Sequence, residues 1–151
     1  MSNILSSTVH ALVFLNGVYD FLCFLGIMWF KRLPFVSSAH LRVFRSEEDT
    51  VNPLTRRLLA YWILTYGTTR MLAGALEHDS YALDCAAAVS YLIEVFGFEY
   101  ELCVERTVIR SKVTFITLAS LPIATALLVM KPLERNTALH TNAALFIQQT
   151  K

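Results

Sequence analysis

The sequence predicts an all-α fold, a polytopic membrane protein whose single domain (1–151) is a bundle of four transmembrane helices. Hydrophobic residues make up 55% of the chain and charged residues only 17%, whereas a soluble domain carries about 25% charged residues. Four segments have close to the ~20 predominantly apolar residues that a helix needs to cross a bilayer. Apolar helices joined by short connections pack side by side, which favours a closed bundle.

The first two predicted spans each contain one charged residue, which is costly to place in lipid. The first covers residues 8–30 and contains Asp20. It is too long and too aromatic for a signal peptide, and no Lys or Arg precedes it, so we expect it to remain as a helix. The second covers residues 58–76 and contains Arg70. Glycines seven residues apart in this segment offer small surfaces for close helix packing.

The third and fourth predicted spans cover residues 81–102 and 113–130. Four acidic residues lower the hydrophobicity of the third, so a re-entrant or interfacial helix is the alternative to a full span: Asp84, Glu94, Glu99 and Glu101. The fourth contains Pro122, which a membrane helix tolerates when neighbouring groups satisfy the freed carbonyl. We expect Lys131 and Pro132 to close this helix.

Two polar segments lie outside the predicted spans, a loop over residues 31–57 and a tail over residues 131–151. We expect the loop to be an ordinary solvated connection, and residues 41–45 suggest a short interfacial turn as the alternative. Apolar residues in the last part of the tail, 136–151, fit either a short amphipathic helix or an irregular tail.

Basic residues predict the orientation in the membrane. Of the 13 Lys and Arg residues, nine lie in the connections between the first two and the last two predicted spans, and three lie in the C-terminal tail. Connections rich in Lys and Arg stay on the cytosolic or matrix side. We therefore predict that both termini face the lumen or the intermembrane space.

Three charged residues fall at similar depths inside the predicted spans. At about 1.5 Å per residue, Asp20, Arg70 and Glu94 lie about 12–18 Å from the basic side. Charged groups at such depth usually face the protein interior, so we predict that Arg70 pairs with Asp20, Glu94 or both. An ion cluster that fixes helix register is the favoured interpretation; a proton path or a substrate pocket is the alternative.

No sequence motif indicates catalytic chemistry. The chain lacks the glycine-rich nucleotide loops, the nucleophile elbow and the zinc-protease motif. Its four His and three Cys residues are scattered without ligand spacing, so we expect no metal and no cofactor. The net charge of +1 provides no basic field for nucleic acid. We expect no enzymatic activity, and we expect the partners to be other integral membrane proteins, with bilayer lipids as a further class.

Three residues of the second predicted helix carry a family resemblance. Arg57 is followed five residues later by Trp62, and Arg70 lies eight residues beyond Trp62. This spacing resembles that of the ergosterol biosynthetic protein twenty-eight family. The chain looks like a divergent member of that family. An aromatic run that ends in Glu101 and a leucine resembles the family's third helix. The similarity covers about residues 54–130.

The resemblance implies a non-catalytic scaffold of the endoplasmic reticulum that tethers the enzymes of sterol C-4 demethylation. It also implies that Arg57, Trp62, Arg70 and Glu101 organise the core of the bundle. We also expect an ion pair between Arg57 and Glu101, because both lie near the basic side. The alternative function is an accessory subunit of a respiratory complex or ATP synthase in the mitochondrial inner membrane. A small transporter or a lipid-modifying enzyme is a weaker alternative, because no inverted repeat or broken helix pair is evident.

Overall fold

The computed structural model describes residues 2–29, 43, 52–76 and 80–149, and the described residues form helices and no strand. The order of elements is α1 (Ser2–Met28), α2 (Pro53–Ala75), α3 (Tyr81–Tyr100), its π-helical continuation η3 (Glu101–Glu105), and α4 (Arg110–Gln149). The predicted all-α membrane bundle is therefore confirmed.

Three segments of the described helices are long and apolar enough to cross a membrane: Ile4–Met28, Tyr81–Glu105 and Arg110–Leu133. The third predicted span is among them despite its acidic residues. Helix α2 has 23 residues, which is long enough, but its Arg, Thr and Tyr residues make it less apolar than the others. A full crossing by α2 stays a prediction.

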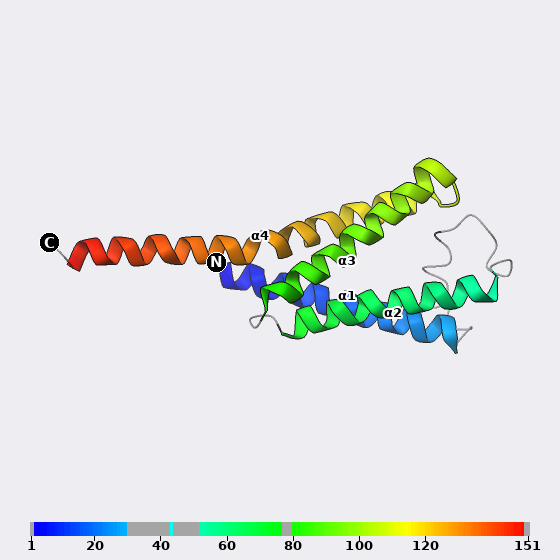
Figure 1. Cartoon of the computed structure of the whole chain (residues 1–151), viewed down its shortest axis with the longest axis horizontal. Coiled ribbons are helices and arrows are strands. Elements are labelled where there is room, and N and C mark those ends of the chain that lie inside the picture. The colour runs from blue at the N-terminus through cyan, green and yellow to red at the C-terminus, as the bar shows by residue number, and fades with distance from the viewer. Residues whose placement is uncertain (1, 30–42, 44–51, 77–79, 150–151) are drawn as a thin grey trace.

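The four helices form two antiparallel hairpins, α1 with α2 and α3 with α4 (Figure 1). The N-terminus lies at one end of the bundle, and the C-terminal part of α4 extends beyond that same end. The C-terminal end of α1, the N-terminal end of α2 and η3 lie at the opposite end. Contacts within each hairpin are extensive, whereas α1 and α4 touch only sparsely. The two hairpins are thus the packing units of the fold.

Glycines bring α1 and α2 into close contact. A Cβ atom added to Gly74 would lie 2.6 Å from the carbonyl oxygen of His10, and one added to Gly67 would lie 2.8 Å from the Cβ of Asp20. On α1, a Cβ added to Gly17 would lie 2.6 Å from the carbonyl oxygen of Gly67. Small residues allow helix backbones to approach at this range, so the glycine spacing sets the geometry of the first hairpin.

Helix α2 begins five residues before its predicted start. The side chain of Asn52 accepts a hydrogen bond from the backbone N–H of Leu54 at 2.8 Å, and Pro53 occupies the first turn. A polar N-cap followed by proline is a strong start signal. Residues 53–57 of the predicted loop therefore belong to α2. Most of the remaining loop lies outside the described residues.

One residue of that loop, Val43, is described and is buried. It packs with Val108 and Val113 at the start of the second hairpin, and its carbonyl oxygen accepts a hydrogen bond from the backbone N–H of Ile109 at 2.9 Å. The loop between α1 and α2 therefore contacts the corner between η3 and α4. The interfacial turn expected over residues 41–45 otherwise lies outside the described residues.

The expectation that Lys131 and Pro132 end the fourth helix is wrong, because α4 continues to Gln149. A proline inside a helix leaves the carbonyl oxygen four residues earlier without its backbone donor. Here that oxygen belongs to Leu128, and the hydroxyl of Tyr81 donates a hydrogen bond to it at 3.0 Å. The second hairpin thus replaces the bond that proline removes, and the predicted tail is a continuation of the helix.

We expect Gly74→Ala to lower the free energy of unfolding by about 1–3 kcal/mol, because its Cβ would press on the backbone of α1. The matched control is Gly97→Ala, whose Cβ would meet no atom within 4 Å. This control should leave stability unchanged or raise it by up to about 1 kcal/mol through helix propensity. Thermal unfolding of both variants in detergent, followed by circular dichroism, is the measurement. Equal loss in both would contradict the close-packing account.

We expect Tyr81→Phe to cost about 0.5–1.5 kcal/mol, because the carbonyl oxygen of Leu128 would lose its donor. In a Pro132→Ala background the same change should cost less, because the restored backbone N–H of residue 132 bonds that oxygen. The measurement is a double-mutant cycle by thermal unfolding. Strict additivity would show that the hydroxyl does not compensate the proline.

Candidate functional site in a buried polar network

Arg70 lies at the centre of a polar network between the two hairpins. Helix α2 places its side chain in the core, where it is 1% exposed. Its Nη1 donates a hydrogen bond to Oδ2 of Asp20 on α1 at 2.8 Å. Its Nη2 donates to Oε2 of Glu94 on α3 at 2.6 Å. The structure therefore brings together the three residues that their membrane depth suggested.

The network includes two polar residues that sequence reasoning missed, Asn16 and Ser90. Arg70 Nε donates to Oγ of Ser90 at 3.0 Å, and Nη1 also donates to Oδ1 of Asn16 at 3.2 Å. The hydroxyl of Tyr91 donates to the same oxygen of Asn16 at 2.7 Å. A signal was present, because Asn16 and Ser90 each lie one helical turn before an acid of the cluster and so share its face.

Aromatic rings complete the surroundings of the guanidinium group. Its central carbon lies 4.5 Å from the ring centroid of Tyr66 on α2 and 3.8 Å from that of Tyr91 on α3. An arginine over aromatic rings gains cation–π attraction, which is larger where water is excluded. Arg70 is thus held by carboxylates, neutral acceptors and rings at once. With both acids ionised, Arg70, Asp20 and Glu94 together carry a charge of −1.

A second buried polar cluster joins α1, α3 and α4, and sequence reasoning missed it. Nε2 of His10 lies 3.0 Å from Oδ1 of Asp84, and Nζ of Lys131 lies 3.1 Å from Oδ2 of the same carboxyl group. The other ring nitrogen of His10 lies 2.9 Å from the carbonyl oxygen of Ser6. His10 and Asp84 are almost fully buried, at 1% and 2% exposure. Comparing depths along the predicted helices would have indicated this cluster, because His10, Asp84 and Lys131 all lie toward the end of the bundle that contains the N-terminus.

Two of the family-like residues do not organise the core. Arg57 is exposed, and Trp62 is 53% exposed. The expected ion pair between Arg57 and Glu101 is absent from the described residues; Oε2 of Glu101 instead accepts a hydrogen bond from the hydroxyl of Thr107. The reason is the packing of α2, which turns its small residues and Arg70 inward and leaves Arg57 and Trp62 on its outer side.

Trp62 and Glu101 nevertheless share a groove between α2 and α3. A cavity of about 160 Å³ lies there, and its lining also includes Glu94 and Gly97. A second hollow of about 360 Å³ continues along the same pair of helices and is lined by Trp62 and Ser90 among others. Trp62 and Glu101 therefore mark a surface groove beside the buried network.

Arg70 bonds Asn16, Asp20, Ser90 and Glu94, so its guanidinium group is held in place. Among the described residues, no three His, Cys, Asp or Glu side chains are grouped to hold a metal ion. What the arrangement does is connect α1, α2 and α3 through one charged side chain.

We expect Arg70→Met to lower the free energy of unfolding by about 3–5 kcal/mol, because it leaves two buried carboxyl groups without their cation. Adding Asp20→Asn and Glu94→Gln should restore part of the loss. The matched control is Arg57→Met, the same change at an exposed position of the same helix. Thermal unfolding in detergent is the measurement, and equal effects of the two single changes would contradict a structural role for Arg70.

Comparison with known proteins bears on the family of the chain. No curated protein and no solved structure matches the chain. The family model described as Erg28 like protein matches residues 7–129. This range includes α2 and α3 entire, most of α1 and α4 as far as residue 129. It contains the whole Arg70 network and all four family-like residues. The chain therefore belongs to the Erg28-like family.

Proposed function

We propose that this protein is a non-catalytic integral membrane scaffold of sterol biosynthesis, which holds partner membrane proteins together in the endoplasmic reticulum. The observation that carries the proposal is the family match over residues 7–129. Three membrane-spanning candidates among the described helices support the membrane location. The partners we propose are the enzymes of sterol C-4 demethylation, which the resemblance implies.

The use of the buried charges supports a scaffold over an enzyme. Arginine stays protonated at physiological pH and therefore does not act as a general base. Its N–H groups donate hydrogen bonds to Asn16, Asp20, Ser90 and Glu94. The positive charge of the network therefore holds α1, α2 and α3 together. A buried ionic network that sets helix register is a recognised use of such groups.

The groove between α2 and α3 is the docking surface that we propose for a partner's transmembrane helix. Trp62 is exposed on one wall of this groove, and Ile93 is 49% exposed on the other. Tryptophan is among the residues that contribute most at protein interfaces.

We expect Trp62→Ala to reduce recovery of stoichiometric partners by about thirtyfold, which corresponds to about 2 kcal/mol for an interface tryptophan. The matched control is Trp29→Ala, because Trp29 is 62% exposed but directly follows the last residue of α1 and does not line the groove. The measurement is quantitative mass spectrometry of proteins that co-purify with the full chain in mild detergent. Unchanged thermal unfolding of both variants shows that a loss is not due to misfolding.

The identity of the recovered proteins tests the proposal further. Enzymes of sterol C-4 demethylation in stoichiometric amounts are the expected result. Subunits of a respiratory complex or ATP synthase would contradict the proposed location and support the mitochondrial alternative. A chain that has no stoichiometric partner and turns over a lipid by itself would overturn the scaffold proposal.

A further inference from the structure

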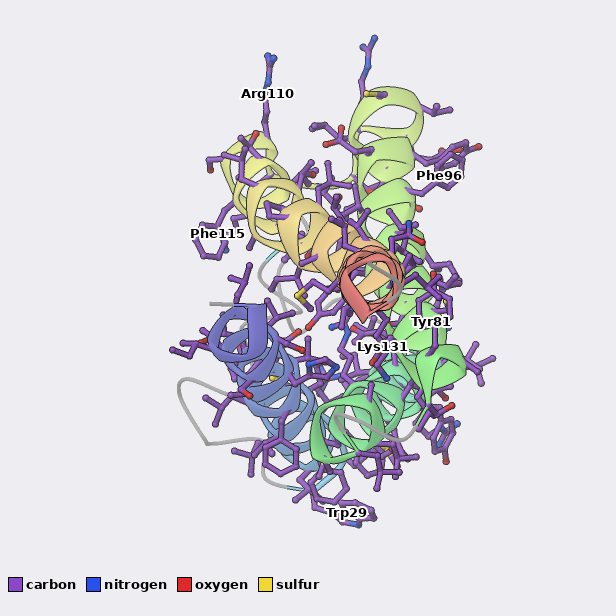
Figure 2. All side chains as sticks on the ribbon, turned by 90° about the vertical axis from the view of Figure 1, so that its left-hand side faces the viewer. Trp29, Tyr81, Phe96, Arg110, Phe115 and Lys131 are labelled. Carbon is purple, nitrogen blue, oxygen red and sulfur yellow. The ribbon has the colours of Figure 1, made fainter. Side chains whose placement is uncertain are left out.

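We propose that the cavity between α1, α3 and α4 binds one lipid molecule through a single uncharged hydroxyl group. The cavity has a volume of about 640 Å³, within the range of sites that enclose one small ligand. It exists because α1 and α4 belong to different hairpins and touch only sparsely. In the view along the bundle, Phe115 lies between the ribbons of these two helices (Figure 2).

The walls of the cavity are suited to a hydrocarbon body. On α4, Phe115, Ala119 and Ile123 recur every four residues and line the cavity along one face. Leu12 of α1 lines the opposite side. Phe115 is 73% exposed and Leu12 is 50% exposed, so apolar side chains flank the opening. Because α1 and α4 are candidate membrane spans, the proposal places the opening in hydrocarbon, where a lipid can enter it without crossing water.

The inner surface of the cavity is polar and belongs to the Arg70 network. Asn16, Asp20, Tyr91 and Glu94 all line it. Asp20 and Tyr91 are 1% and 2% exposed, so their polar atoms are held away from the surface by the helices around them. A mostly apolar cavity with a few fixed polar groups is the usual form of a specific small-molecule site.

The free hydrogen-bonding capacity of this surface matches a hydroxyl group. Oδ1 of Asn16 accepts bonds from Arg70 and Tyr91, which fixes the orientation of the amide and leaves its NH₂ group as a donor. Glu94 uses Oε2 for Arg70, and within the described part of the chain its Oε1 has no hydrogen-bond partner. A hydroxyl donates one hydrogen bond and accepts others, so it can bond Glu94 and Asn16 together.

Charge and depth favour a hydroxyl over a charged headgroup. Asp20 and Glu94 lie two to three helical turns from the end of the bundle where Lys112 lines the cavity. Bringing a phosphate to that depth would place it against carboxyl groups and remove it from water, which is costly. An ammonium group would be attracted by the charge of −1 but would lose its hydration at that depth, whereas a hydroxyl loses much less. Sterols and diacylglycerols both carry one such hydroxyl, and the experiment distinguishes them.

This inference goes beyond the proposed scaffold function and does not depend on it. Partner recovery depends on the groove between α2 and α3, and lipid binding depends on the cavity on the other side of the bundle. Loss of one property without the other therefore separates the two proposals.

The test uses the purified full chain in phosphatidylcholine nanodiscs and a photoreactive sterol with a free 3β-hydroxyl. We expect cross-links on α4 near Ala119 and competition by unlabelled cholesterol. The methyl ether of cholesterol, which lacks the donor, should compete about tenfold less well. Ala119→Phe should reduce labelling about tenfold by filling the cavity, whereas Ala82→Phe, the same change on the exposed face of α3, should not.

A second variant keeps the test decisive if Ala119→Phe does not fold. Phe115→Ala removes an exposed ring at the opening and should weaken labelling at least threefold at unchanged thermal stability. Competition by dioleoylglycerol instead of cholesterol would support the hydroxyl site and change its ligand to a diacylglycerol. Equal competition by cholesterol and its methyl ether would overturn the proposal, and so would displacement by phosphatidylserine or by sphingosine.

Discussion

The structure depends on one constraint, a guanidinium group that must be satisfied away from water. Arg70 projects from α2 into the core, and a charge at such depth is tolerated only with bonded partners around it. Those partners come from α1 in one hairpin and from α3 in the other. The need to give this single side chain hydrogen-bond partners therefore specifies how the hairpins meet. Apolar packing alone specifies helix arrangement only weakly in lipid.

The hollows of the molecule follow from the same constraint. Close backbone contact at Gly67 and Gly74 holds α1 and α2 together, while the second hairpin meets them through the Arg70 network and through the cluster of Asp84. Side chains that bridge hairpins at two places leave space on both sides of each bridge. The groove of Trp62 and the cavity of Phe115 are those spaces. Glu94 lines both, so the structural charge cluster also supplies the polar surface of the candidate sites.

The depth of a charged residue in the membrane, counted along its helix, correctly predicted which charges meet. Charges in different spans that lie at the same depth must meet or remain unpaired, which is why Arg70 could be matched to its acids. The expected ion pair of Arg57 failed because depth does not specify rotation about the helix axis, and α2 turns that side chain outward. The helix end expected at Pro132 failed because the compensating hydroxyl of Tyr81 comes from another helix, which no local rule includes.

The sequence by itself determined the membrane class, the four helices, the charged residues at core depth and the family resemblance, because composition, segment length and residue spacing are properties of one chain segment at a time. Only the tertiary structure decided which faces those segments present to one another. It showed that Asn16, Ser90 and Tyr91 join Arg70, that a second cluster forms around Asp84, and that a cavity separates α1 from α4. These features arise from the relative rotation and crossing of helices, which depend on contacts between residues far apart in the chain.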